Sequence, residues 1–473
     1  MRAAGLLLVS LSLASAAVVV GGPPVAQAQA LCNGLAVTLP GTEGDDVLDG
    51  TEGSDVIAGG AGSDVIRGLG GDDVLCGNAD DDRLEGGAGD DVIIGGDDRR
   101  GEEWGESHFY YYGDLLTGGA GDDTLVGDGP EVTGDHPHGD DTVSYADSAR
   151  GVTVRLDLGT VTGEGHDTLD TVSSVVLSDH DDHAVLGGDG AQVDGGAGDD
   201  VLSTAPGFRP PYRATDALID GYLDGGSGDD LLRSAAPGWM LRGSGGADRL
   251  VAGGRSSLDG GPGADVVVGS QGADDIATAG PGRDSVRARG GADLLLLGRA
   301  SEDQLAPVDA DLGDGADTVE VHVSPRDGTT ISLGAGADDV AWAPYAFDSE
   351  AAPLPQVRFV AGRGRDHLGV PLMIADSSPG RPAGVRADLS AGTVRTLGTH
   401  SRMTVLGFED LTGSPWADVL LGSVGANGIH GGERDDVLDG RGGRDVLVGD
   451  TGHDRADGGT GDDRCDAEVT HSC

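Results

Sequence analysis

The sequence has no lysine and very few aromatic residues. Its 473 residues include 82 acidic and only 30 basic side chains, for a formal net charge of -52 at pH 7. Aromatic residues make up 3% of the chain, which excludes a large conventional core, because such cores depend on big aromatic side chains. A surface this acidic repels nucleic acid and anionic membranes. We therefore expect no nucleic-acid partner.

Long apolar runs are missing outside the N-terminus. Past residue 30 no segment reaches the roughly twenty apolar residues that a membrane span requires, so no span is expected. Residues 1–30 have the parts of a secretory signal peptide, with a basic residue, an apolar run over 6–20 and an A-x-A site ending at Ala30. A membrane anchor is the alternative, but the run is short and interrupted from Gly21. We predict a cleavable signal and a secreted, extracellular protein.

Two common catalytic signatures are also absent. The chain contains no H-E-x-x-H, the zinc-protease motif, and no G-x-S-x-G, the nucleophile elbow of lipases. Acidic pairs are abundant, but two carboxylates indicate catalysis only in a cleft that perturbs their pKa values. We therefore predict no catalytic residue and a non-enzymatic protein. A secreted hydrolase or polysaccharide-modifying enzyme, with its site in the irregular regions, remains the alternative.

Glycine is abundant, with 88 residues, and it recurs with a period of nine. Residues 41–94 read as six tandem units, GTEGDDVLD, GTEGSDVIA, GGAGSDVIR, GLGGDDVLC, GNADDDRLE and GGAGDDVII. Each unit opens with Gly, has Asp at its sixth position and has Leu or Ile at its eighth. A disordered Gly/Asp linker, the alternative, would not keep an apolar residue at every ninth position.

The nonapeptide has a physical interpretation. Glycines allow positive φ in a tight turn, and positions seven to nine form a short strand that turns only position eight to one face. One turn plus one strand is half a coil, so residues eighteen apart should stack at about 4.8 Å. Stacked carboxylates repel one another. Calcium relieves this repulsion, because it takes six to eight carboxylate and carbonyl oxygens in a flexible shell.

The sixth-position residues are therefore the candidate calcium ligands, and multiple calcium ions are the expected cofactor. They are Asp46, Asp55, Asp64, Asp73, Asp82, Asp91, Asp123, Asp200, Asp230, Asp248, Asp265, Asp274, Asp293, Asp418, Asn427, Asp436, Asp445, Asp454 and Asp463. Asn427 keeps an oxygen but lacks the charge, so we expect a weaker site there.

These repeats resemble the G-G-x-G-x-D-x-U-x unit of the repeats-in-toxin (RTX), or hemolysin-type, calcium-binding family. The resemblance implies an all-β, right-handed parallel β-roll or β-helix solenoid, calcium at its turns, and export as an unfolded chain that folds outside the cell. Two features depart from the family. The expected export signal is N-terminal and cleavable, and about ten residues between it and Gly41 leave no room for an effector domain.

The repeats and their interruptions predict the following organisation. The segments are 1–30, signal peptide; 31–40, N-terminal cap; 41–145, first calcium block with an insertion at 97–117; 146–186, β-solenoid spacer; 187–299, degenerate repeats; 300–383, irregular solenoid or inserted domain; 384–412, second spacer; 413–466, last calcium block; and 467–473, C-terminal cap. Residues 151–186 and 384–421 resemble each other, which indicates an internal duplication.

The chain also contains four cysteines and one cluster of aromatic residues. An even number of cysteines in an exported chain favours disulfides, with three connectivities open. We favour Cys32–Cys76 and Cys465–Cys473, because each pair would staple one end of a solenoid, where an unpaired coil needs a cap.

The insertion at 97–117 contains Trp104 and Tyr110 to Tyr112. These could pack as a local core or bind a partner, for which a cell-surface glycan or protein is the candidate.

Overall fold

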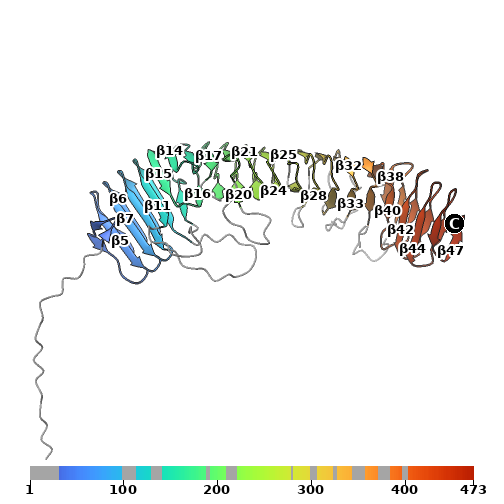
Figure 1. Ribbon diagram of the computed structural model, residues 1–473, viewed down its shortest axis with the longest axis horizontal. Coiled ribbons are helices and arrows are strands. Elements are labelled where there is room, and N and C mark those ends of the chain that lie inside the picture. Colours follow the sequence, from blue (N-terminus) through green and yellow to red (C-terminus); the bar gives the residue numbers. More distant parts are fainter. Residues whose placement is uncertain are drawn as a thin grey trace, which may run out of the picture.

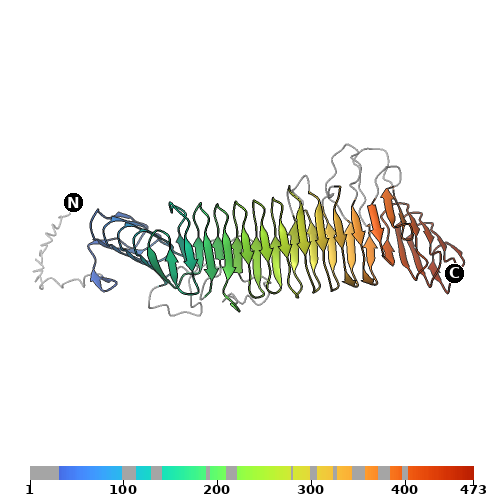
Figure 2. The same cartoon turned by 90° about the horizontal axis from the view of Figure 1, so that it is seen from above.

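The computed structural model describes residues 31–97, 113–128, 141–187, 192–208, 221–278, 281–298, 306–322, 327–342, 357–370, 384–396 and 403–473. The described chain winds into a long, gently curved rod whose short strands stack side by side from one end to the other (Figures 1 and 2). Within the described residues every regular element is a β-strand, and no helix there is long and apolar enough to cross a membrane. The fold is the predicted parallel β-roll solenoid.

Two sheets run along the rod and form its two walls, and we call them sheet one and sheet two. Sheet one contains, in order along the rod, β4 (Val47–Asp49), β6 (Val65–Gly70), β8 (Arg83–Ala88), β10 (Leu115–Ala120), β12 (Thr142–Ser144), β16 (Ser174–Val176), β18 (Gln192–Asp194), β20 (Gly221–Asp224), β22 (Trp239–Arg242), β24 (Ser256–Asp259), β26 (Asp275–Thr278), β28 (Leu294–Leu297), β30 (Thr318–Val321), β33 (Asp339–Trp342), β36 (His367–Gly369), β40 (Asp410–Thr412), β42 (Gly428–Glu433), β44 (Val446–Thr451) and β46 (Arg464–Asp466).

Sheet two lies opposite. It contains β3 (Leu39–Pro40), β5 (Val56–Ala61), β7 (Val74–Ala79), β9 (Val92–Asp97), β11 (Thr124–Asp128), β15 (His166–Asp170), β14 (Thr160–Thr162), β13 (Thr153–Arg155), β17 (His183–Leu186), β19 (Val201–Thr204), β21 (Leu231–Arg233), β23 (Arg249–Val251), β25 (Val266–Val268), β27 (Asp284–Arg287), β29 (Val308–Asp311), β31 (Thr330–Ser332), β34 (Arg358–Val360), β39 (Met403–Leu406), β38 (Thr393–Thr396), β37 (Val385–Asp388), β41 (Val419–Leu421), β43 (Val437–Asp439), β45 (Arg455–Asp457) and β47 (Val469–His471). Two small sheets pair β1 (Leu31–Cys32) with β2 (Leu35–Ala36), and β32 (Ala335–Gly336) with β35 (Arg363–Gly364).

The strand register follows the predicted eighteen-residue coil in the regular blocks. Leu48 pairs with Ile66, and Ile57 pairs with Leu75. Each eighth-position side chain therefore lies above its counterpart and points between the two sheets. Ile57, Ile66 and Leu75 are all completely buried, and each such burial contributes about 1.5–3 kcal/mol.

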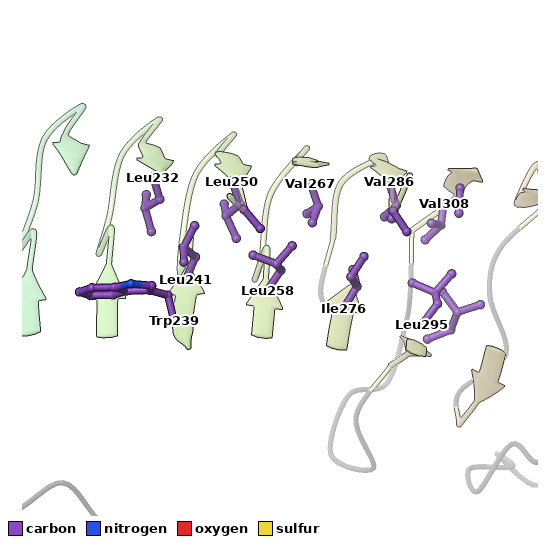
Figure 3. Close-up of a cluster of buried hydrophobic side chains, with 14 of the residues drawn as sticks. Leu232, Trp239, Leu241, Leu250, Leu258, Val267, Ile276, Val286, Leu295 and Val308 are labelled. Atoms are coloured by element: carbon purple, nitrogen blue, oxygen red, sulfur yellow. The ribbon is translucent and has the colours of Figure 1, made fainter. Parts of the chain in front are cut away.

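The same single layer of apolar side chains fills the middle of the rod. Leu232, Leu250 and Val267 of sheet two face Leu241 and Leu258 of sheet one across the interior (Figure 3). Some strands bury two side chains, as Trp239 and Leu241 of β22 do. Leu, Ile and Val fill most of the interior of a chain with 3% aromatics, and Trp239, Trp342 and Phe359 are its largest fully buried side chains.

The two spacers share one topology that differs from the rest of the rod. In the first, β13, β14 and β15 form an antiparallel meander, and its outer strands pair in parallel with β17 and β11. In the second, β37, β38 and β39 repeat this arrangement between β41 and β34. The alternating Val and Leu pattern did not reveal the reversed middle strand, because parallel and antiparallel strands share the same period of two.

Both predicted disulfides are confirmed. Cys32–Cys76 fastens the β1–β2 hairpin to β7, and Cys465–Cys473 ties the chain end to β46. Cys32 and Cys76 are buried against Val37 and Ala58, so the first staple also covers apolar surface at the start of the rod.

Two irregular regions are described only in part. Within 300–383, β29, β30, β31, β33, β34 and β36 continue both sheets. Most of the insertion at 97–117, including its aromatic residues, lies outside the described residues, as does the predicted signal peptide.

Candidate metal centre

The sixth-position carboxylates stack in rows along the two edges where turns enter the strands. In each row the backbone N–H of one residue donates to Oδ1 of the carboxylate on the following coil, at 2.7–3.2 Å. The rows entering sheet one are Asp46–Asp64–Asp82–Asp114–Asp141, Asp274–Asp293–Asp317–Asp338–Asp366 and Asn427–Asp445–Asp463. The rows entering sheet two are Asp55–Asp73–Asp91–Asp123–Asp167, Asp182–Asp200–Asp230–Asp248–Asp265–Asp284 and Asp418–Asp436–Asp454.

Glycine lets these turns approach one another. A Cβ at Gly59 would collide with Oδ2 of Asp64 in the same turn, and a Cβ at Gly87 would collide with the carbonyl oxygen of Leu69 on the preceding coil. Gly87 also has a φ of 112°, in the region that favours glycine. Glycine at these two places therefore lets carbonyl and carboxylate oxygens crowd into the turn.

One carboxylate oxygen in most turns has no protein partner. The second oxygen, Oδ2, is buried without a hydrogen bond from any described residue. This holds for Asp64, Asp73, Asp82, Asp91, Asp123, Asp200, Asp230, Asp248, Asp265, Asp293, Asp317, Asp338, Asp436, Asp445, Asp454 and Asp463. Burying charged oxygen without a partner is costly, so repetition of this feature turn after turn indicates that the turns are suited to bind a cation.

The electrostatics of the metal-free turns agree with this interpretation. Burial, helped by the stacked neighbouring carboxylates and opposed by a backbone hydrogen bond, raises the pKa of Asp82, Asp91 and Asp200 to about 7. Without a metal the turn thus disfavours its own negative charge. A bound cation would oppose that shift, because a positive charge beside the carboxylate favours its ionised form.

The oxygens present fit calcium better than a transition metal. Among the described residues no group of three or more His, Cys, Asp or Glu side chains comes together as a ligand set. Backbone carbonyls of the preceding coil do face the turn, as Leu69 O faces Gly87 and Gly71 O faces Gly89. Calcium accepts carbonyl and carboxylate oxygens together, so one carboxylate with several carbonyls is a suitable set.

The nineteen sequence-predicted residues all lie in these rows, but they fall into two groups. Fourteen of them have the unpartnered oxygen. In the other five, Asp46, Asp55, Asp274, Asp418 and Asn427, the corresponding oxygen accepts a backbone N–H from the same turn.

Several row members lie in turns where the Gly pattern is weak or lost. They are Asp114, Asp141, Asp167, Asp182, Asp284, Asp317, Asp338 and Asp366. The signal that finds them is an Asp two residues before a buried apolar residue, as in Asp317 before Val319. The row at Asp167 ends differently, because the Tyr145 hydroxyl donates to its Oδ2 at 2.9 Å.

Comparison with known proteins agrees with the turn geometry. The profile of the RTX calcium-binding nonapeptide repeat (4 copies) matches residues 40–75, 77–99, 111–129, 242–276, 272–300 and 430–465. No curated protein matches the chain. A solved structure, a hyperactive, Ca2+-dependent, β-helical antifreeze protein from an Antarctic bacterium, is 15% identical over 70% of this chain and 85% of its own, with a TM-score of 0.19. The two chains do not superpose as whole molecules at that score.

Proposed function

Because the chain is a β-roll protein of the RTX calcium-binding type, we propose that it is a secreted, non-enzymatic rod that folds when it binds several calcium ions outside the cell. The unpartnered Oδ2 atoms carry this proposal. Asp64, Asp82 and Asp91, with the carbonyls of adjacent turns, would hold ions in the first block, and Asp436, Asp445 and Asp454 in the last. A bound ion would supply positive charge between stacked carboxylates and would bind the turn carbonyls.

Folding and metal binding would then be one equilibrium. A polyanion with a net charge of -52 and few large apolar side chains repels itself when it has no metal. A site that exists only in the folded state adds its binding free energy to folding. Extracellular calcium modules bind at about 10⁻⁴–10⁻³ M, so the chain would stay unfolded before export and fold after it.

A calcium titration tests this proposal. Purified protein dialysed against chelator should show an expanded scattering profile and weak β signal in far-UV circular dichroism. Millimolar calcium should compact it and restore the β signal, whereas magnesium at the same concentration should have a much smaller effect. Magnesium demands near-octahedral geometry and gives up its water reluctantly. A metal-free protein that is already compact and protease-resistant would contradict the proposal.

The extracellular location rests on two further observations. Disulfides persist in oxidising compartments, and here one closes each end of the rod. The N-terminal thirty residues also have signal-peptide composition. Fractionation of the producing cells should place the protein outside the cytoplasm with a mature N-terminus at Leu31, and a cytoplasmic chain that retains Met1 would refute this part.

A role at a cell surface or in a matrix, including adhesion, fits an acidic rod of stacked coils. The candidate partner is a cell-surface glycan or protein, and the candidate contact is the insertion at 97–117. Deleting only residues 98–112, which leaves β9, Asp114 and β10 in place, should abolish attachment to cells or glycans while calcium-induced folding stays intact. Attachment that survives the deletion would exclude this contact.

A further inference from the structure

Six turns with Ser or Thr at the second position satisfy their own carboxylate, and one turn without Ser or Thr also does, because Gly362 donates its N–H to Oδ2 of Asp366 at 3.2 Å. In the first, Thr42 donates its backbone N–H to Oδ2 of Asp46 at 2.7 Å and its hydroxyl at 2.8 Å. The same backbone bond, at 2.6–2.8 Å, recurs wherever Ser or Thr takes this role. The pairs are Thr42 with Asp46, Thr51 with Asp55, Ser178 with Asp182, Ser270 with Asp274, Ser414 with Asp418, and Ser423 with Asn427. We call these closed turns, and the turns with an unpartnered Oδ2 open turns.

Each closed turn stands at the start of one row, and each row starts with one. At three row starts the residue at the corresponding place on the preceding coil is not acidic. There Val152, Ser256 and Val385 donate their backbone N–H to Oδ1 of Asp182, Asp274 and Asp418. Before Asn427 that place is taken by Glu409, whose carboxylate accepts the Asp366 N–H. These three closed turns, at Asp182, Asp274 and Asp418, therefore have their carboxylate row on one side only, and both oxygens of each Asp are already bonded to protein.

Backbone conformation separates the two kinds of turn independently of the hydrogen bonds. The second residue has positive φ in every open turn, from 65° at Asp450 to 122° at Gly60. The Ser or Thr of a closed turn does not have positive φ. Ser244 is instructive because it occupies the second position of an open turn inside a row. It has a φ of 68°, and its hydroxyl donates to Asp224 instead. Row position, as well as residue type, thus determines whether a turn closes.

Asn427 gives a second, chemical indication that closed turns differ from open turns. It starts its row, and its Oδ1 accepts the Ser423 N–H at 2.7 Å while its Nδ2 donates to the carbonyl oxygen of Glu409 at 2.8 Å. A neutral amide with both ends bonded to protein fills the place that Asp fills elsewhere. A carboxylate is therefore dispensable at a row start, as it would be if no cation bound there.

We propose that the six closed turns bind no calcium and act as metal-independent starts for the rows, so that calcium binds only in the open turns that follow. This rests on the proposed calcium function and assigns which turns carry it out. The Ser or Thr N–H and hydroxyl replace the ion at the first turn of each row. Each row then has a rigid first turn, against which the next turn and its ion can be placed.

A matched pair in one row tests this. Asp182 and Asp200 are both buried sixth-position residues on successive coils, one closed and one open. Bound calcium per chain, measured on full-length protein by equilibrium dialysis and elemental analysis at saturating calcium, should fall by at least one ion in Asp200→Asn. It should not fall in Asp182→Asn. Loss of an ion in both variants would overturn the inference and leave the calcium function standing, whereas wild type without bound calcium would refute the calcium function itself.

A second variant keeps the test decisive if Asp182→Asn fails to fold. Asn427→Asp adds a carboxylate to a closed turn and removes nothing buried and apolar. We expect the ion count to stay at the wild-type value, because Ser423 still occupies the oxygen. A gain of one ion would show that closed turns bind calcium whenever charge is present and would overturn the proposal.

Discussion

At the residue scale, glycine matters here because oxygen atoms of adjacent coils crowd together. The second position of an open turn tolerates Leu69, Asn78 or Arg289 at positive φ, so a side chain there is not always excluded. The strain of an L-residue in that region is of order 1–3 kcal/mol. Rows in which several second positions are not Gly should accordingly form less stable turns in the absence of calcium.

Gly87→Ala tests this argument against Gly44→Ala. Gly87 has positive φ, and a Cβ there would meet the Leu69 carbonyl, whereas a Cβ at Gly44 would meet nothing within 4 Å. We expect Gly87→Ala to destabilise the calcium-loaded protein by more than about 1 kcal/mol, since Ala is strained at positive φ. Gly44→Ala should change stability much less. Guanidinium unfolding at fixed calcium measures both, and equal effects would contradict the argument.

At the element scale, the rod ends need staples because an end coil has neighbours on one side only. The two disulfides close loops of different size, with sequence separations of 44 and 8. In the chain-entropy treatment the longer loop is worth about 4 kcal/mol and the shorter about 2.5 kcal/mol. We expect Cys32→Ala with Cys76→Ala to lower stability more than Cys465→Ala with Cys473→Ala. Unfolding curves of both double variants, recorded with bound calcium, measure the two losses of stability. The reverse order would contradict the chain-entropy explanation of the disulfides.

Sequence reasoning reached the coil and the core positions because both depend on local periodicity, and it reached the disulfides because the four cysteines lie near the two ends of the rod. It could not follow the rows through Asp114 and Asp167, because insertions displace them to 32 and 44 residues from their partners Asp82 and Asp123. It did not separate Asp46 from Asp64, although the second residue of the turn, Thr42 against Gly60, marks the difference. Ser244 occupies the same position without closing its turn, so place in the row also matters, and that property belongs to the stacked assembly.

At the scale of the whole molecule, the rows make the metal-free fold sensitive to pH. Burial raises the pKa of Asp82, Asp91, Asp284 and Asp436 to about 7, and of Asp123 to about 6, in the metal-free turns. In an unfolded chain such groups titrate near 3.9. A raised folded pKa means that protonation favours the fold. This contribution is complete below about pH 4 and is lost as pH rises through about 6–7.

We therefore expect acid to replace calcium in part. In chelator, the far-UV β signal and compactness should be greater at pH 5 than at pH 8, and the calcium midpoint should rise as pH falls, because protons compete with the ion.

The double variant Asp82→Asn with Asp91→Asn should gain metal-free β signal at pH 8, since it removes two buried charges. Its control, Asp45→Asn with Asp72→Asn, removes the same charge at exposed positions and should gain less. A metal-free signal that is independent of pH, or equal gains in both double variants, would show that overall charge and not the buried rows opposes folding.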